Sequence, residues 1–162
     1  MKKIVIRVLI AVLIVGSVYS ILWYTNYNSY EKYITLNVTY SSGGGYLMED
    51  EEKSLLYYVK KPSLFSFTGN LVGQTEDDSI SIILWPSFLC KDISEIGVVL
   101  KDNTKQEAYF LYVDKDMNLS ESQTTGLDMT RQQTAEAILK SRKDVLVEIY
   151  KNIIDKYGLE ND

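Results

Sequence analysis

The stretch SISIILWPSFLCKDISEIGVVLKDNTKQEAYFLYV, residues 79–113, decides the fold. It contains three apolar runs separated by polar connections: 79–85, 93–101 and 107–113. In the last run Ala108, Phe110 and Tyr112 alternate with Tyr109 and Leu111, which is the two-residue period of a β-strand. The stretch therefore predicts three successive strands joined by short turns.

Upstream, the β pattern continues to residue 64. Residues 64–72 form another apolar run, and a polar turn at 73–78 joins it to the run that begins at Ser79, so we expect a hairpin. Residues 33–40 alternate in the same way and predict a first strand. Residues 49–61 begin with acidic residues and end with lysines, which favours a helix. The β-prone segment Leu55–Val59 makes a strand the alternative.

Downstream, residues 120–128 are polar, and a long helix is predicted over residues 130–157 with Gly158 as its C-cap. Arg142 interrupts the apolar stripe of this helix. The pattern predicts an α+β fold in which five or six antiparallel strands pack one face on the C-terminal helix and leave the other face free.

The N-terminal segment predicts a membrane anchor. Val8–Tyr24 is almost wholly apolar, and as a helix it spans about 26 Å, close to the thickness of a bilayer core. The positive charges that precede it place the N-terminus in the cytoplasm and the rest of the chain outside, and aromatic residues stand at the outer interface. The residues concerned are Lys2, Lys3 and Arg7 at the inner side and Trp23 and Tyr24 at the outer side.

A cleaved signal peptide is the alternative, because Val18-Tyr19-Ser20 resembles a cleavage site and its removal would give a secreted domain. In the anchored reading, residues 1–25 are the signal anchor, 26–32 a polar spacer, 33–158 the extracytoplasmic domain and 159–162 a tail.

Composition narrows the function. The 162 residues include 17 Lys and Arg, 22 Asp and Glu, one Cys and no His. Three of the bases and none of the acids lie before residue 31, so residues 31–162 carry 14 bases against 22 acids, a charge of −8. These counts exclude histidine-based catalysis, imidazole or cysteine zinc sites and intrachain disulfides, and the acidic balance argues against nucleic-acid binding. We expect no enzyme activity, no cofactor and no resident metal.

Candidate partner-binding residues are acidic or aromatic. Acids in turns favour a basic partner, and aromatic side chains on a free sheet face are typical protein-recognition anchors. Asp114-Lys115-Asp116-Met117-Asn118 begins like a calcium loop but lacks the required Gly and Glu at later positions, so a hairpin turn is favoured over a weak cation site. The candidates are Glu76, Asp77, Asp78, Trp85, Tyr109, Asp114 and Asp116.

The anchor, the segment ISEIGVVLKD at 93–102, the segment AYFLYVDKDMNL at 108–119 and the C-terminal helix together resemble TipC-type immunity proteins. That resemblance implies a non-enzymatic protein on the outer face of the cell membrane. Such a protein binds and neutralises a cognate LXG toxin exported by the type VII pathway. A second hypothesis is an extracytoplasmic adaptor or sensor of a cell-envelope complex. A third is an envelope hydrolase that works through carboxylates.

Overall fold

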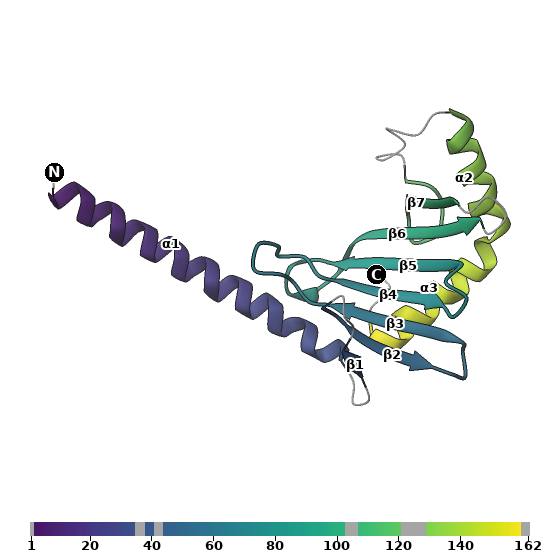
Figure 1. Cartoon of the computed structure of the whole chain (residues 1–162), viewed down its shortest axis with the longest axis horizontal. Coiled ribbons are helices and arrows are strands. Elements are labelled where there is room, and N and C mark those ends of the chain that lie inside the picture. The colour runs from purple at the N-terminus through teal and green to yellow at the C-terminus, as the bar shows by residue number, and fades with distance from the viewer. Residues whose placement is uncertain (1, 35–37, 41–43, 103–106, 121–128, 160–162) are drawn as a thin grey trace.

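A computed structural model describes residues 2–34, 38–40, 44–102, 107–120 and 129–159. It consists of one long N-terminal helix that projects from an antiparallel sheet, and two C-terminal helices that cover one face of this sheet (Figure 1). The elements are α1 (Lys2–Ser29), η1 (Tyr30–Tyr33), β1 (Thr39–Tyr40), β2 (Tyr46–Asp50), β3 (Leu55–Lys60), β4 (Asn70–Thr75), β5 (Ile80–Pro86), η2 (Phe88–Cys90), β6 (Ile93–Asp102), β7 (Glu107–Val113), α2 (Met129–Ser141) and α3 (Lys143–Tyr157).

The sheet is a simple antiparallel meander. Its strands lie in chain order from β1 to β7, and each pairs with the next along the chain. Six of the strands have five residues or more, and β1 adds a two-residue edge. The predicted α+β class is confirmed, as is the hairpin between β4 and β5.

The core lies between the sheet and α3, and its residues alternate along each strand. Leu71, Ile82 and Val98 are fully buried on the face that α3 covers. Gly73 belongs to the same face, and a Cβ built there would lie 2.5 Å from Ile153 Cδ1 on α3. The missing side chain therefore lets α3 approach the middle of the sheet closely.

The predicted helix over 130–157 is divided at Arg142, whose φ of −111° and ψ of 9° are not helical. The break lies where a charged residue interrupts the apolar stripe. With the helix broken here, Leu139 and Leu146 are both buried while Arg142 keeps partial contact with solvent. Gly158 is the left-handed C-cap of α3 at φ 59°, as predicted.

Three predicted elements in the first half of the chain also differ from the structure. Within the predicted strand at 33–40, Tyr33 belongs to η1 and only Thr39–Tyr40 is a strand, while residues 35–37 lie outside the described part. The helix over 49–61 is absent: Leu55–Lys60 is β3, the alternative that the β-prone residues allowed, and its partner β2 was not predicted. The strand expected at 64–72 begins only at Asn70.

The predicted polar loop at 120–128 and the tail at 159–162 fall largely outside the described residues.

The segment 26–32, predicted to be a spacer, is helical and packed against the domain. Tyr30 is fully buried, and its hydroxyl accepts a hydrogen bond from the Gly69 backbone N–H at 3.0 Å. Asn26 is also fully buried, and its side chain donates to the Phe67 carbonyl at 2.5 Å and accepts from the Leu89 N–H at 2.7 Å. The end of α1 is therefore part of the domain core, and the helix is continuous with the domain.

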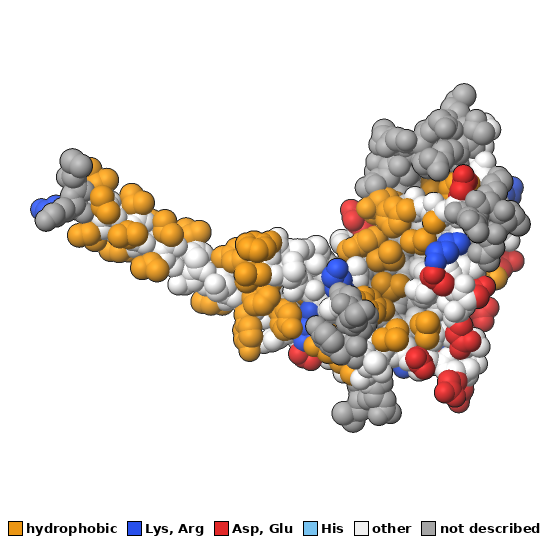
Figure 2. All heavy atoms as spheres, viewed as in Figure 1, with side chains coloured by type: hydrophobic (Ala, Val, Ile, Leu, Met, Phe, Trp, Pro, Cys, Tyr) orange, Lys and Arg blue, Asp and Glu red, His pale blue; other side chains and the backbone are white. Residues whose placement is uncertain are grey.

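The remainder of α1 is long and apolar enough to cross a membrane. Its apolar side chains are exposed along the whole segment, and Lys2, Lys3 and Arg7 lie at the end farthest from the domain (Figures 1 and 2). Trp23 and Tyr24 lie near the other end, a position typical of aromatic residues at a membrane–water interface. A cleaved signal sequence would share the length and composition of this helix.

Candidate protein-binding surface

The sheet face opposite α3 carries an aromatic cluster formed by Trp85, Phe110 and Tyr112. The Trp85 ring stacks on Tyr112 at a centroid distance of 5.9 Å, and Phe110 meets Trp85 and Tyr112 edge-on at 6.2 and 4.8 Å. Phe110 is 44% exposed, which is high for a large apolar side chain on a strand. Such rigid aromatic groups, presented with part of their surface to solvent, are preferred anchors in protein interfaces.

Gly97 makes this cluster possible. It lies on β6 directly opposite Tyr112, and a Cβ built on it would lie 2.8 Å from the Trp85 ring and 2.9 Å from the Phe110 ring. The absent side chain leaves room for the Trp85 ring to lie across the strand. Gly97 therefore supports the aromatic cluster from below without contributing contact area of its own.

An apolar band extends from the aromatic cluster across the whole open face. Successive strands pair Leu47 with Tyr58, Tyr58 with Val72, Val72 with Ile83 and Ile83 with Gly97. The side chains of Leu47, Tyr58, Val72 and Ile83 in this band are all partly exposed. Hydrophobic groups gather over this face in Figure 2, whereas acidic groups gather at the end of the sheet away from α1.

Comparisons of the chain with protein-family models, curated proteins and solved structures find no match.

Tyr109, which was predicted to share a surface with Trp85, lies on the other side of the sheet. It is only 5% exposed, packs in the core, and donates a hydrogen bond from its hydroxyl to Glu107 Oε2 at 2.6 Å. The physical reason is the strand period, which sends Tyr109 and Phe110 to opposite faces. Phe110 and Tyr112 are the partners of Trp85 that sequence reasoning missed, and the same alternation would have identified them once the inward face was known.

The three acids predicted at the β4–β5 turn differ in their surroundings. Asp77 accepts hydrogen bonds from Thr75 Oγ1 at 2.6 Å and from the Ser79 N–H at 3.0 Å, and these bonds lower its pKa to about 2. Asp78 forms an ion pair with Lys101 and also accepts from Gln74 at 2.7 Å. Asp77 and Asp78 thus stabilise the turn itself, while Glu76 extends into solvent.

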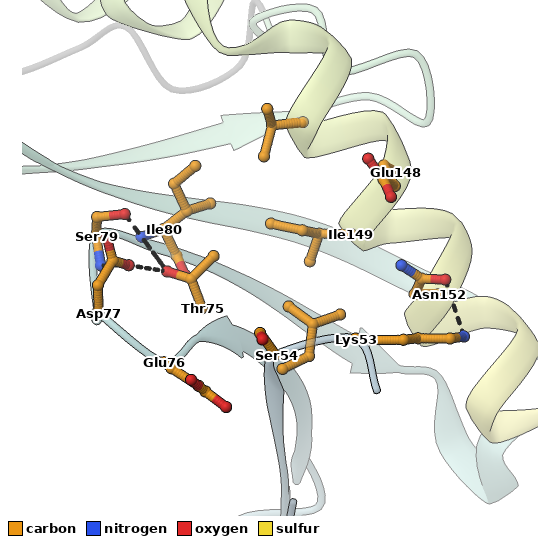
Figure 3. A pocket seen from close by; sticks show the side chains of 12 residues that line it. Lys53, Ser54, Thr75, Glu76, Asp77, Ser79, Ile80, Glu148, Ile149 and Asn152 are labelled. Atoms are coloured by element: carbon orange, nitrogen blue, oxygen red, sulfur yellow. Dashed lines mark hydrogen bonds between the residues drawn. The ribbon is translucent and has the colours of Figure 1, made fainter. Parts of the chain in front are cut away.

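Glu76 and Asp77 also line a cleft of about 440 Å³ between the β2–β3 turn, the β4–β5 turn and α3 (Figure 3). Its floor is apolar, and charged groups stand around its rim, among them Lys53, whose ammonium donates to Asn152 Oδ1 at 3.0 Å. The lining residues are Lys53, Ser54, Leu55, Thr75, Glu76, Asp77, Ser79, Ile80, Val145, Glu148, Ile149 and Asn152. The shape and lining suit a short apolar side chain flanked by charge.

Asp114 and Asp116 lie in the turn that follows β7. One carboxylate oxygen of Asp114 accepts the backbone N–H groups of Asp116 and Asn118 at 2.9 and 2.8 Å, and the other accepts the Asn118 amide at 3.0 Å. Desolvation alone would raise the pKa of Asp114, but the hydrogen bonds from Asn118 outweigh it and lower the pKa. These contacts describe a side-chain-capped turn, the structure that the sequence favoured over a cation loop.

Metal binding has no evident site in the described part of the chain. There, no three His, Cys, Asp or Glu side chains come together in a way that would hold an ion.

Proposed function

We propose that this chain is a membrane-anchored immunity protein whose domain lies outside the cytoplasm and neutralises a secreted LXG-type toxin by binding it. The observation that carries the proposal is the aromatic cluster on the open face of the sheet. A stable domain gains nothing by leaving Phe110 and Tyr112 partly in water, whereas a protein partner would bury them.

Charge and topology support this reading. The net charge of −8 over residues 31–162 would attract a basic partner and speed its encounter with the domain. The positive N-terminal end of α1 favours a cytoplasmic N-terminus and an external domain. The resemblance to TipC-type immunity proteins supplies the class of partner.

The hydrogen bonds between α1 and the domain favour a retained anchor over a cleaved signal. Cleavage after Ser20 would remove Tyr19, which donates a hydrogen bond to the Leu64 carbonyl at 2.6 Å and packs edge-on against the Phe67 ring at 5.1 Å. N-terminal sequencing of the mature protein tests this point, and a chain beginning at Ile21 would contradict it.

Toxin protection gives a direct test with a matched pair of variants. Phe110 and Phe88 have the same exposure, 44%, but Phe88 belongs to η2, which packs against α1, and its ring meets that of Phe67 at 6.1 Å. Cells that express an LXG toxin encoded next to this gene should be protected by the wild-type chain and by Phe88→Ala, and poorly protected by Phe110→Ala. Truncation of one central interface aromatic residue typically costs about 2 kcal/mol or more, a loss of at least about 30-fold in affinity.

Equal protection by both variants would exclude the aromatic cluster as the binding surface. Failure of the wild-type chain to protect, combined with co-purification of a membrane enzyme or transporter, would favour the adaptor alternative.

A further inference from the structure

The loop between β3 and β4 exposes large apolar side chains beside the membrane-spanning helix. Phe65 is 91% exposed and Leu64 is 56% exposed, and Phe88, 44% exposed, belongs to η2, which also packs against α1. Residues 62–73 contain no charged residue. Exposing such a loop to water is unfavourable, and its position next to the apolar helix α1 suggests that it contacts lipid.

Three backbone carbonyls of the loop, those of Ser63, Leu64 and Phe67, accept hydrogen bonds from side chains of α1. Trp23 Nε1 donates to the Ser63 carbonyl at 2.6 Å, and Tyr19 donates to the Leu64 carbonyl at 2.6 Å. The Ser66 N–H also bonds to the Ser63 carbonyl at 3.0 Å. Because unpaired backbone groups are costly in lipid, these hydrogen bonds lower the cost of bringing the loop, with its outward apolar side chains, to the membrane.

The depth of the loop follows from the position of Tyr19. This residue lies five positions inside the outer end of the apolar segment Val8–Tyr24, about 8 Å along the helix axis. Helical side chains point toward the N-terminus of their helix, so the Tyr19 hydroxyl lies deeper still. The Leu64 carbonyl that it contacts is therefore level with the outer part of the membrane.

We propose that residues 63–68 insert, with Leu64 and Phe65 leading, into the leaflet on the side of the domain. The partner surface is lipid, because the loop is continuous with the lipid-facing surface of α1. The inference rests on the proposed membrane anchoring. Its consequence is a second point of attachment, which fixes the tilt of the sheet relative to the membrane and hence the direction in which the aromatic cluster faces.

Site-directed spin labelling tests the depth of the loop. The full chain, with Cys90→Ala as background, is labelled at single cysteines and reconstituted in vesicles of phosphatidylcholine and phosphatidylglycerol. Collision rates with oxygen and with a water-soluble nickel chelate then report whether each label lies in lipid or in water. Phe65→Cys is the test position, Leu13→Cys reports on the anchor, and Glu76→Cys, at the far end of the sheet, is the aqueous control.

The label at position 65 should resemble that at 13, with an oxygen-to-nickel collision ratio severalfold higher than at 76. A ratio at 65 equal to that at 76, with position 13 in lipid, would overturn the inference while leaving the anchor intact. A water-like ratio at position 13 would overturn the anchoring and the inference with it. Because Phe65 is almost fully exposed, its replacement leaves the fold unchanged, which circular dichroism checks.

Discussion

Replacement of Asn26 by alanine should loosen the joint between the anchor and the domain. The Asn26 side chain is fully buried and bridges two loops, through the Phe67 carbonyl at 2.5 Å and the Leu89 N–H at 2.7 Å. Each buried group left without a partner costs about 1–3 kcal/mol, so the upper limit is about 6 kcal/mol. Since Phe67 and Leu89 are only partly buried, water can hydrogen-bond to the freed groups and offset part of this cost. We expect the free energy of unfolding to fall by about 2–3 kcal/mol.

The assay is urea unfolding of the full chain in detergent micelles, followed by tryptophan fluorescence. Thr25→Ala is the matched control, because the neighbouring Thr25 hydroxyl is exposed and bonds to the Ile21 carbonyl of its own helix at 2.8 Å. It should change stability by less than about 0.5 kcal/mol. Indistinguishable unfolding of the two variants would refute the idea that Asn26 holds the helix on the domain.

Three further changes test the fold and its charges. Gly73→Ala should lower the free energy of unfolding by about 1–3 kcal/mol, because the new Cβ would meet Ile153. In the double variant, Ile153→Val should relieve part of this loss. Strictly additive losses in a double-mutant cycle would contradict the close contact. The pKa of Asp77, about 2, lies below its ordinary value of about 4, so its ionised form stabilises the turn above pH 4 and this contribution is lost as the pH falls toward 2. Asp77→Asn should thus lower the urea midpoint at pH 7 and match the wild type near pH 2; a difference that did not change with pH would argue against the hydrogen-bonded carboxylate. Burial raises the pKa of Tyr57 from about 10 to about 12, so the unfolded chain ionises first and stability should fall as the pH rises above 10. Part of the tyrosinate absorbance should then appear only on unfolding. Ionisation of every tyrosine near pH 10 in the folded protein would show that the Tyr57 ring is not buried.

The strands near the middle of the chain were predictable because their pattern is strong and their turns are polar. β5, β6 and β7 lie where alternation and β-branched residues placed them. The helix at 49–61 was predicted wrongly because acids before an apolar run and lysines after it are consistent with a helix dipole, and they suit a charged hairpin turn equally well. Tertiary pairing with β4 decided between the two.

The binding surface was only half predictable. The aromatic residues can be read from the sequence, but which face of a strand points inward depends on what packs against it. Tyr109 and Phe110 therefore could not be assigned to the buried or the open face from the local pattern alone. The joint between α1 and the domain was less visible still. Asn26 and Tyr30 read as polar spacer residues, and only the loops folded around them, from far along the chain, show that they are buried.

Neutralisation of a toxin through the open sheet face can be tested by measuring the affinity of the purified full chain, in detergent, for the LXG toxin encoded beside it. We predict tight binding by the wild-type chain, an affinity at least about 30-fold weaker for Trp85→Ala, and no more than a small change for Phe88→Ala. Absence of binding by the correctly folded wild-type chain would exclude the proposed neutralisation, and full affinity in Trp85→Ala would exclude the aromatic cluster as the binding surface.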